Sequence, residues 1–280
     1  MTKNLYDFVW KHASNNSTGG ITFPDENLEL DWQALTLRAD ACAAGLSELG
    51  VGHEAVVFLC GRNSSALLAA FLGAQRAGAT PSILAPRMSA AGDFIESLLL
   101  KIRIARPAAL LLDRTIADDE YEELKASLRR SLEKPYADEL RICRLEEITI
   151  EGATLPEARP SSLAFLQFTS GSVLNPRAVQ ISHENLEANC RAIIEHSQID
   201  STDVWVSWLP LFHDMGFGWR HGVVDNLGRH AGSGRSVQVH RKPYCLAQTN
   251  LEAPSNNNGC SEHGLFDLRH ENPGKPSCWD

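Results

Sequence analysis

Apolar residues recur along the first two hundred residues with two periods, one typical of helices and one of buried strands. Between Asp31 and Leu49 they lie three or four positions apart, which places them on one face of a helix. Asp31 is suited to begin that helix, and Gly50 stands where glycine favours its end. The other expected helices are 64–77, 93–104, 117–132 and 183–196, and the expected strands are 55–60, 81–85, 108–112, 163–168, 178–181 and 204–208.

Short apolar strands separated by helices are typical of an α/β domain with a mainly parallel sheet and flanking helices. In such a domain, ligands bind at the loops that leave the ends of the strands. The 280 residues are 43% hydrophobic and 22% charged, which is an ordinary composition for a globular protein. No apolar run reaches the ~18 residues that suggest a membrane helix, so no membrane span is expected.

Charge and cysteine content exclude several classes of function. The net charge is −9 and no stripe of Lys and Arg occurs, so we expect no nucleic-acid partner. The seven cysteines include no Cys-x-x-Cys pair, which argues against a zinc ribbon or a redox motif. Scattered cysteines and an N-terminus without an apolar signal core favour a cytoplasmic protein with reduced thiols.

The composition changes after Phe217. Only ten of the 63 residues that follow are Leu, Ile, Val or Phe, which is below the roughly 20% level associated with disorder in chains of high charge, although seven Lys and Arg balance six Asp and Glu here. This segment shows neither a helical nor a strand period, and burial cannot readily offset the entropy of ordering such a sequence. We therefore expect a domain over residues 1–217 and an irregular tail over residues 218–280.

A polar loop of small residues, Thr169 to Arg177, connects the expected strands 163–168 and 178–181. Small residues let backbone N–H groups turn toward an anion, and Arg177 adds a fixed positive charge. The Walker sequence G-x-x-x-x-G-K-[ST] is absent. From the residues alone, the loop either binds a phosphate group or is a polar hairpin between two strands.

Two histidines lie next to these elements. His183 follows Ser182, a residue suited to cap a helix, so we interpret His183 as a helix-start residue rather than a catalyst. His213 follows the expected strand 204–208, where it is either a hydrogen-bonded residue at the strand end or part of a site.

Three ordered motifs resemble the adenylate-forming superfamily, which includes acyl-CoA synthetases, nonribosomal peptide synthetase adenylation domains and luciferases. The first is Phe-Thr-Ser-Gly-Ser at 168–172, followed by Pro-Arg at 176–177 and Ile-Ser-His at 181–183. The second, Trp-Leu-Pro-Leu-Phe-His-Asp-Met-Gly at 208–216, is most similar to the fatty acyl-AMP ligase branch. The third is upstream, where Phe-Leu-Gly-Ala-Gln-Arg-Ala-Gly-Ala-Thr-Pro at 71–81 is similar to the opening stretch of the superfamily.

The resemblance implies a ligase that uses ATP and Mg²⁺ to activate a fatty or other carboxylic acid as acyl-AMP. CoA or an acyl carrier protein is then the implied acceptor. By motif, His213 borders the acyl pocket as the catalytic candidate, and the implied phosphate-binding residues are Thr169, Ser170, Gly171, Ser172 and Arg177.

The sequence also departs from the family pattern. Val173 and Leu174 stand where the family often has Thr-Gly, and Arg177 stands where it usually has Lys. Arg keeps the charge but presents a planar fork of donors, so its contacts with phosphate differ from those of Lys.

Nothing after Gly216 resembles the family's magnesium-binding Glu motif, ribose-binding Asp, hinge or catalytic Lys. The resemblance therefore implies a truncated N-terminal domain that is inactive alone. The alternative is a non-catalytic acyl- or nucleotide-binding module that pairs with a full-length ligase. Back-translation of residues 242–260, read one base out of frame, permits a Trp-Leu, Ile-Ser and Ala-Thr stretch similar to one in the family. We therefore hypothesise that the tail is read out of frame.

Overall fold

The computed structural model describes residues 4–15, 19–86, 91–152, 155, 159–169, 176–196, 204–207, 209–213, 235–239 and 265–268. The chain divides into two compact units, one of residues 1–7 and 36–185 and one of residues 8–35 and 186–280. Each unit is described by itself. No helix in the described part of the chain is long and apolar enough to cross a membrane.

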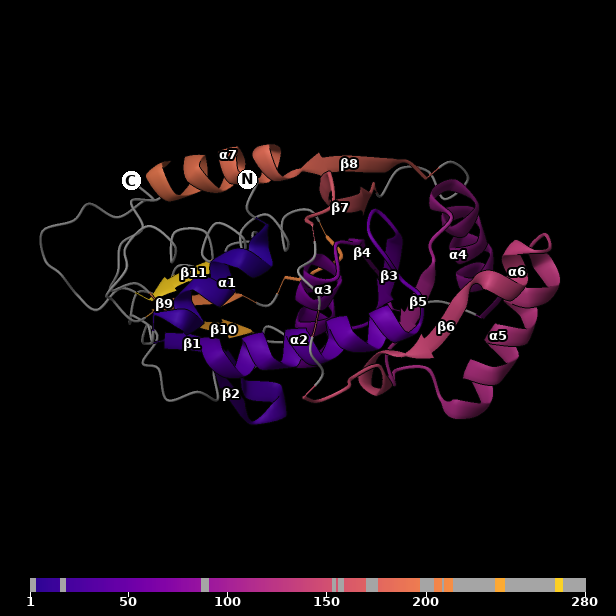
Figure 1. Ribbon diagram of the computed structural model, residues 1–280, viewed down its shortest axis with the longest axis horizontal. Helices are drawn as coiled ribbons and strands as arrows, with labels where there is room; N and C mark the ends of the chain where they lie inside the picture. Colours follow the sequence, from indigo (N-terminus) through magenta and orange to yellow (C-terminus); the bar gives the residue numbers. More distant parts are fainter. Residues whose placement is uncertain are drawn as a thin grey trace, which may run out of the picture. The chain divides into compact units, whose positions relative to one another are not determined.

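The order of the elements along the chain is shown in Figure 1. The helices are α1 (Leu5–Ser14), α2 (Trp32–Glu48), α3 (Ser65–Arg76), α4 (Ala91–Ala105), α5 (Asp118–Ser131), α6 (Tyr136–Glu139) and α7 (His183–His196), with short 3₁₀ helices η1 (Pro24–Glu26) and η2 (Leu145–Glu147). The strands are β1 (Gly19–Phe23), β2 (Leu28–Asp31), β3 (Val56–Cys60), β4 (Thr80–Leu84), β5 (Ala109–Leu112), β6 (Arg141–Arg144), β7 (Leu163–Phe168), β8 (Ala178–Ser182), β9 (Val204–Ser207), β10 (Arg235–Val239) and β11 (Leu265–Leu268).

A four-stranded parallel sheet forms the centre of the first unit. Its order is β4-β3-β5-β6, and each neighbouring pair runs parallel. Helix α3 lies on one side of this sheet, and α4 and α5 lie on the other (Figure 1). This arrangement confirms the expected α/β class, because covering helices on both faces are what a parallel sheet requires.

Strands β3 and β5 of this sheet are apolar on both faces because both faces are buried. Phe58 on β3 and Leu110 on β5 are fully buried and lie in one cluster with Ile102 of α4 and Leu128 of α5. Burial of each such side chain contributes about 1.5–3 kcal/mol. The short apolar runs of the sequence are therefore strands rather than helix segments.

Three helices begin at capping side chains, two of which, Asp31 and Ser182, the sequence indicates. The Leu67 N–H donates to Ser64 Oγ (3.1 Å), and the Ala34 N–H donates to Asp31 Oδ1 (2.6 Å). Ser182 Oγ accepts from the N–H three residues later at the start of α7 (3.1 Å). Each side chain satisfies a backbone donor that has no partner within its helix, which confirms the predicted starts.

Glycines stand at two helix ends and at one helix contact. Gly50 and Gly78 have φ values of 79° and 77°, the left-handed region that glycine adopts at low cost. A Cβ atom on Gly73 of α3 would lie 2.6 Å from Cys42 Cβ and 2.8 Å from the Ala39 carbonyl oxygen. Only glycine therefore lets α3 approach α2 this closely.

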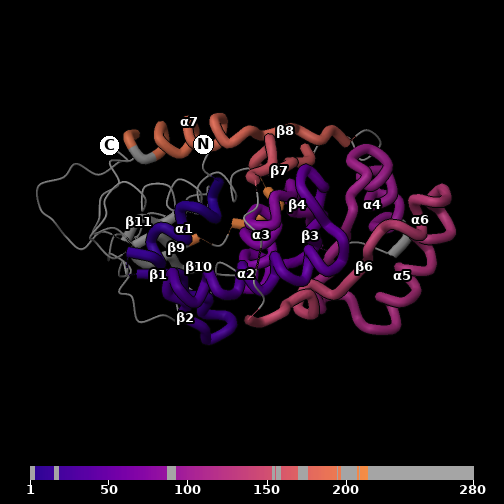
Figure 2. Tube along the Cα trace, viewed as in Figure 1, coloured from indigo at the N-terminus to yellow at the C-terminus, as the bar shows by residue number. Residues whose placement is uncertain are grey.

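Strands β7 and β8 form an antiparallel hairpin in the first unit. Phe165 lies opposite Ile181, and Phe168 lies opposite Ala178. The Phe168 ring meets the Phe58 ring edge-on at 5.7 Å, so the hairpin is attached to the core of the parallel sheet. Figure 2 follows the chain from β8 directly into α7.

The second unit contains a five-stranded mixed sheet in the order β11-β9-β10-β1-β2. Strand β10 runs parallel to β1 and to β9, whereas β2 and β11 pair antiparallel. Trp32 and Phe23 are fully buried in this unit, and the Trp32 ring lies 5.7 Å from the His12 ring. Strands β10 and β11 fall within the expected tail 218–280, and the boundary at residue 217 stays a prediction.

The start of α1 is fastened by one buried side chain of α3. Gln75 Oε1 accepts from the N–H groups of Leu5 (3.1 Å) and Tyr6 (3.3 Å). Gln75 Nε2 donates to the Ala164 carbonyl oxygen on β7 (3.0 Å). Only 3% of Gln75 is exposed, so these groups have no ready access to water as a substitute partner.

We expect Gln75→Leu to lower the free energy of unfolding by about 3 kcal/mol, because three buried polar groups lose their partners at similar side-chain volume. Urea unfolding followed by circular dichroism measures the change. Gln33→Leu is the matched control, because Gln33 is exposed on α2. An equal effect of both substitutions would contradict this role for Gln75.

Candidate functional site

The loop singled out by the sequence begins and ends at the tip of the β7–β8 hairpin. The Thr169 N–H donates to the Arg177 carbonyl oxygen (3.1 Å), which closes the two strands at the mouth of the loop. Both residues are exposed, and Arg177 has no ion-pair partner among the described residues. The structure thus brings together two of the predicted phosphate-binding residues, and Ser170, Gly171 and Ser172 lie outside the described residues.

The inner strand of the hairpin is held by aromatic packing. Phe168 contacts Phe58 of β3, and Phe165 meets the Phe71 ring of α3 with centroids 6.4 Å apart. All but two of the six residues of β7 are buried, whereas no residue of β8 is fully buried. The loop is therefore presented by one anchored strand and one outer strand.

A cluster of polar side chains fixes the opposite end of the hairpin; we call Glu54, Ser161, Ser162 and His183 the hairpin clamp. Glu54 Oε1 accepts from the Ser162 N–H (2.8 Å), and Oε2 accepts from the Ser162 and Ser161 hydroxyls (2.9 and 3.0 Å). His183 Nε2 donates to the Ser161 carbonyl oxygen (3.1 Å). The Ser161 hydroxyl also shares a hydrogen bond with Thr80 at the start of β4.

The clamp favours an ionised carboxylate and a neutral imidazole. Desolvation alone would raise the pKa of Glu54, but the hydrogen bonds from Ser162 and Ser161 and the nearby His53 outweigh it and lower that pKa. Burial lowers the pKa of His183, against the opposing influence of the Ser161 carbonyl, Asp7 and Glu54. His183 is thus a buried residue at a helix start, as the sequence interpretation expects.

The predicted catalytic histidine lies in the second unit. His213 is exposed in a turn that follows β9, where its N–H donates to the Pro210 carbonyl oxygen (3.1 Å). The neighbouring Leu211 is buried, so the turn is anchored by an apolar side chain. The predicted role of His213 beside an acyl carboxylate stays a prediction.

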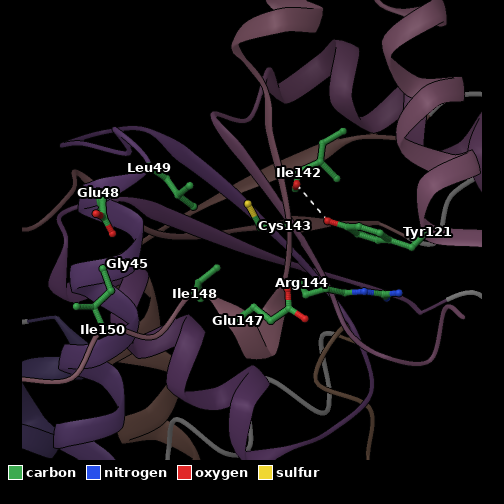
Figure 3. Close-up of a pocket in the computed structure, with 10 residues that line it drawn as sticks. All are labelled: Gly45, Glu48, Leu49, Tyr121, Ile142, Cys143, Arg144, Glu147, Ile148 and Ile150. Atoms are coloured by element: carbon green, nitrogen blue, oxygen red, sulfur yellow. Dashed lines mark hydrogen bonds between the residues drawn. The ribbon is translucent and has the colours of Figure 1, made fainter. Parts of the chain in front are cut away.

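A cavity of about 290 Å³ lies at the free edge of β6, away from the motif residues. Figure 3 shows Glu48 and Glu147 on its rim, and Cys143 and Ile148 between them. The Arg144 guanidinium is not available to neutralise them, because it donates to Asp118 (2.7 Å) and to two carbonyl oxygens. Glu147 is itself paired with Arg114 (2.9 Å), so the lining residues offer no available cation to a fatty carboxylate, and this cavity does not suit the predicted substrate.

The carboxyl edge of the parallel sheet is another place where such folds bind anions. The chain leaves β3 for β4 on one side and returns to β5 on the other, which makes a switch point between β3 and β5. Asp113 fills this place: Oδ2 accepts from the Arg62 N–H (2.8 Å) and Oδ1 from the Thr115 N–H (3.1 Å). The donors at the switch point therefore already hold a carboxylate of the chain itself.

Comparison with known proteins identifies the group to which this arrangement belongs. The sequence model of the family described as AMP-binding enzyme matches residues 10–224. The chain belongs to the AMP-binding enzyme family.

Relatives and solved structures place the chain near fatty acyl ligases. It is 29% identical over 189 residues to the long-chain-fatty-acid–AMP ligase FadD32 of Mycobacterium marinum, which is 66% of this chain and 28% of that protein. It is 42% identical over 72 residues to the medium-chain-fatty-acid–[acyl-carrier-protein] ligase TtuA of Teredinibacter turnerae, which is 26% of this chain and 11% of that protein. A structure from work on the fatty acyl-adenylate ligases of E. coli and L. pneumophila matches with a TM-score of 0.68 and 26% identity, over 87% of this chain and 42% of that one. The chain thus spans less than a third of the length of FadD32.

We expect acid to destabilise the first unit through His183. Its folded pKa lies below the unfolded value of about 6.5. As the pH falls, the unfolded chain therefore binds the proton before the folded chain does. The contribution of neutral His183 to stability is present above the unfolded pKa and is lost as the pH falls below it. Urea unfolding of the wild type and of His183→Asn between pH 7.5 and 5.5 measures this.

The substituted protein should lose less stability than the wild type over this interval. His196→Asn is the control, because His196 is exposed at the end of α7. If the free energy of unfolding depends on pH in the same way for the wild type and His183→Asn, His183 does not contribute to the loss of stability in acid.

Proposed function

We propose that the protein takes part in ATP-dependent activation of a fatty acid to acyl-AMP, with the β7–β8 loop holding the phosphates. The observation that carries this proposal is the exposed Arg177 and Thr169 at the closed mouth of a hairpin loop rich in hydroxyls. The family match and the similarity to fatty acyl-AMP ligases support the reaction type and the acyl substrate.

In the proposed reaction, a carboxylate oxygen of the fatty acid attacks the α-phosphorus of ATP. The bond from the α-phosphorus to the bridging oxygen breaks, and its electron pair leaves on pyrophosphate. Negative charge therefore accumulates on the leaving group, which Arg177 and the N–H and hydroxyl groups of 169–172 stabilise. His213 borders the reacting carboxylate in this proposal.

A thiol completes the proposed sequence. The thiolate of CoA or of an acyl carrier protein attacks the acyl carbonyl, and AMP leaves with the electrons of the acyl–oxygen bond. A carrier-protein acceptor is supported by the similarity of one segment of the chain to TtuA, whose name gives that acceptor.

A phosphate of ATP at the loop mouth is supported by the exposed Arg177, whose planar donors suit phosphate oxygens. In the described part of the chain no three His, Cys, Asp or Glu side chains gather, so these residues do not form a metal site by themselves; Mg²⁺ is commonly held by substrate phosphates together with one or two carboxylates. The proposal therefore has no step that depends on a metal held by these residues.

We also propose a boundary at residue 217 between a ligase domain of residues 1–217 and a tail of residues 218–280, whose strands β10 and β11 pair with β1 and β9. The low content of large apolar residues in that segment supports this boundary. An out-of-frame origin of the tail is tested by the encoding DNA. A shifted frame without a long open extension that carries the family's later motifs would exclude it.

We expect Arg177→Ala to weaken ATP binding about 10- to 100-fold, because a hydrogen-bonded charge on phosphate is worth about 1.5–3 kcal/mol. Arg177→Lys should keep part of the affinity, since the charge remains without the planar fork. Calorimetric titration with ATP measures this, and Arg129→Ala on the exposed face of α5 is the control. Unchanged affinity in Arg177→Ala would contradict a phosphate role for the loop.

We expect residues 1–280 alone to release pyrophosphate slowly from ATP and a fatty acid, compared with a full-length ligase such as FadD32. The reason is that these residues contain no match to the family's magnesium-binding Glu and catalytic Lys. A coupled pyrophosphate assay measures the rate. Comparable turnover would refute this prediction, and ATP binding without turnover would favour the non-catalytic binding module.

A further inference from the structure

We propose that Glu54 is a positioning residue for the phosphate-binding loop, acting through the hairpin clamp at the far end of β7 and β8. This inference rests on the proposed function for the role of the loop. The role of the clamp itself rests on the hydrogen bonds of Glu54 to the start of β7.

The carboxylate projects from a backbone that the parallel sheet holds in place. The Glu54 N–H donates to the Gly78 carbonyl oxygen (2.9 Å), and the Thr80 N–H donates to the Ala55 carbonyl oxygen (2.8 Å). Glu54 has a φ of 64°, a backbone conformation that side-chain-bearing residues adopt rarely and only where the surroundings impose it. The segments that begin β3 and β4 therefore fix the direction in which the carboxylate points.

The clamp joins both strands of the hairpin to that fixed carboxylate. Ser161 and Ser162 immediately precede β7, and His183 immediately follows β8. Three hydrogen bonds run from the two serines to Glu54, and one runs from His183 back to the Ser161 carbonyl. A single group of contacts thus sets where β7 begins and where β8 ends.

Because β7 is long, a small rotation at Ser162 produces a larger displacement at Thr169. At 3.3–3.4 Å per residue, the path from Ser162 to Thr169 is about 23 Å. Apolar packing of Phe165 and Phe168 is non-directional, so the contacts that fix the direction of β7 are the hydrogen bond from Gln75 to the Ala164 carbonyl oxygen and the bonds to Glu54 at the start of the strand. A rotation of about 2° at the clamp, small enough for Phe168 to stay packed on Phe58, would move the mouth of the loop by about 0.8 Å over that length.

Exposure indicates what Glu54 contributes. The Glu54 side chain is 45% exposed, so water screens its charge and its hydrogen bonds add little to the overall stability of the unit. Three donors nevertheless converge on it from two consecutive residues at the start of β7. An exposed acceptor with such convergent partners is suited to orienting a segment rather than to stabilising a core.

The test compares Glu54→Ala with Glu54→Gln in the full 280-residue chain. Hydrogen exchange measures the amides of 163–169 and 176–182 against those of 56–60 and 109–112, and calorimetric titration measures the affinity for ATP. Glu139→Ala is the matched control, because Glu139 is exposed on α6.

We expect Glu54→Ala to speed exchange in the hairpin at least tenfold and to weaken ATP binding at least fivefold. Exchange in β3 and β5 and the Tm should remain those of the wild type. Glu54→Gln retains an acceptor for the Ser162 N–H, so it should restore most of both properties. Ser162→Ala removes one hydroxyl only and should give a smaller change in the same direction.

Unchanged hydrogen-exchange rates in the hairpin of Glu54→Ala would overturn the proposal. An equal increase of the exchange rates in β3 and β5 would overturn it too, because it indicates a general loss of stability. Fast hairpin exchange with unchanged ATP affinity would overturn the positioning role. A wild-type chain that binds no ATP would overturn the proposed function instead. In that case, hairpin exchange alone still decides whether Glu54 holds the hairpin.

Discussion

The first unit depends on the burial of β3 between two parallel neighbours. Val57, Phe58, Leu59 and Cys60 are each at most 1% exposed, and both edges of the strand are hydrogen-bonded. A strand in this position needs cover on both faces, which α3 provides on one side and α4 and α5 on the other (Figure 1). The ring of Phe58 then offers an apolar surface on which Phe168 of β7 packs. The hairpin that carries the motif loop is thereby attached to a central, buried strand of the sheet.

The same sheet explains why the candidate site is at the hairpin and not at the switch point. Asp113 occupies the switch point and is only 6% exposed, and a Cβ on Gly61 would lie 2.9 Å from its Oδ2. The donors that elsewhere bind a ligand anion are used to fix the β5–α5 connection. Arg144 reinforces this connection by donating to the Asp113 and Ile116 carbonyl oxygens. Among these groups, the exposed Arg177 at the loop mouth is the one that remains available to an anion.

Much of the first unit could be predicted from sequence because its signals are local. Caps such as Ser64 and Ser182 and the left-handed Gly50 mark helix ends within a few residues. Strands β3, β5 and β7 are short apolar runs, and their bounds agree with the expected ranges to within a residue at each end. The α/β class follows from the alternation of these two patterns.

Other elements carry weaker local signals. Strand β6 has the sequence Arg-Ile-Cys-Arg, which is not an apolar run. Its Arg144 side chain is nevertheless buried, because it pairs with Asp118 and its guanidinium carbon lies 4.0 Å from the Tyr121 ring centroid. Helix α1 lies outside the expected helices, although Asn4 and Asp7 form a reciprocal capping pair at 2.9 Å at its start. Strand β2 alternates over only four residues, Leu-Glu-Leu-Asp, and β1 begins with two glycines, so neither gives a strong strand signal.

The candidate site divides into parts that sequence reveals and parts that it does not. Thr169 and Arg177 are found by motif because they are close in the chain and lie at the ends of apolar strands. Glu54 and Ser162 are 108 residues apart, and neither residue type is unusual in its local context. Their contact depends on the fold: β4 pairs with β3, which Glu54 precedes, and the chain later returns to that side of the sheet with Ser162, just before β7.

Different contacts attach the β7–β8 hairpin to the core and set its orientation. Aromatic packing attaches β7 to the core, and such packing tolerates small rotations because it has no preferred direction beyond ring geometry. Hydrogen bonds to Glu54 and Ser161 lose strength steeply with angle, so they select one orientation. Recognition of a phosphate by Arg177 needs donors held within fractions of an ångström, a tolerance that packing of an outer hairpin does not provide by itself. An ionised, exposed carboxylate far from the loop is therefore a physically sufficient means of adding the missing precision without burying a charge.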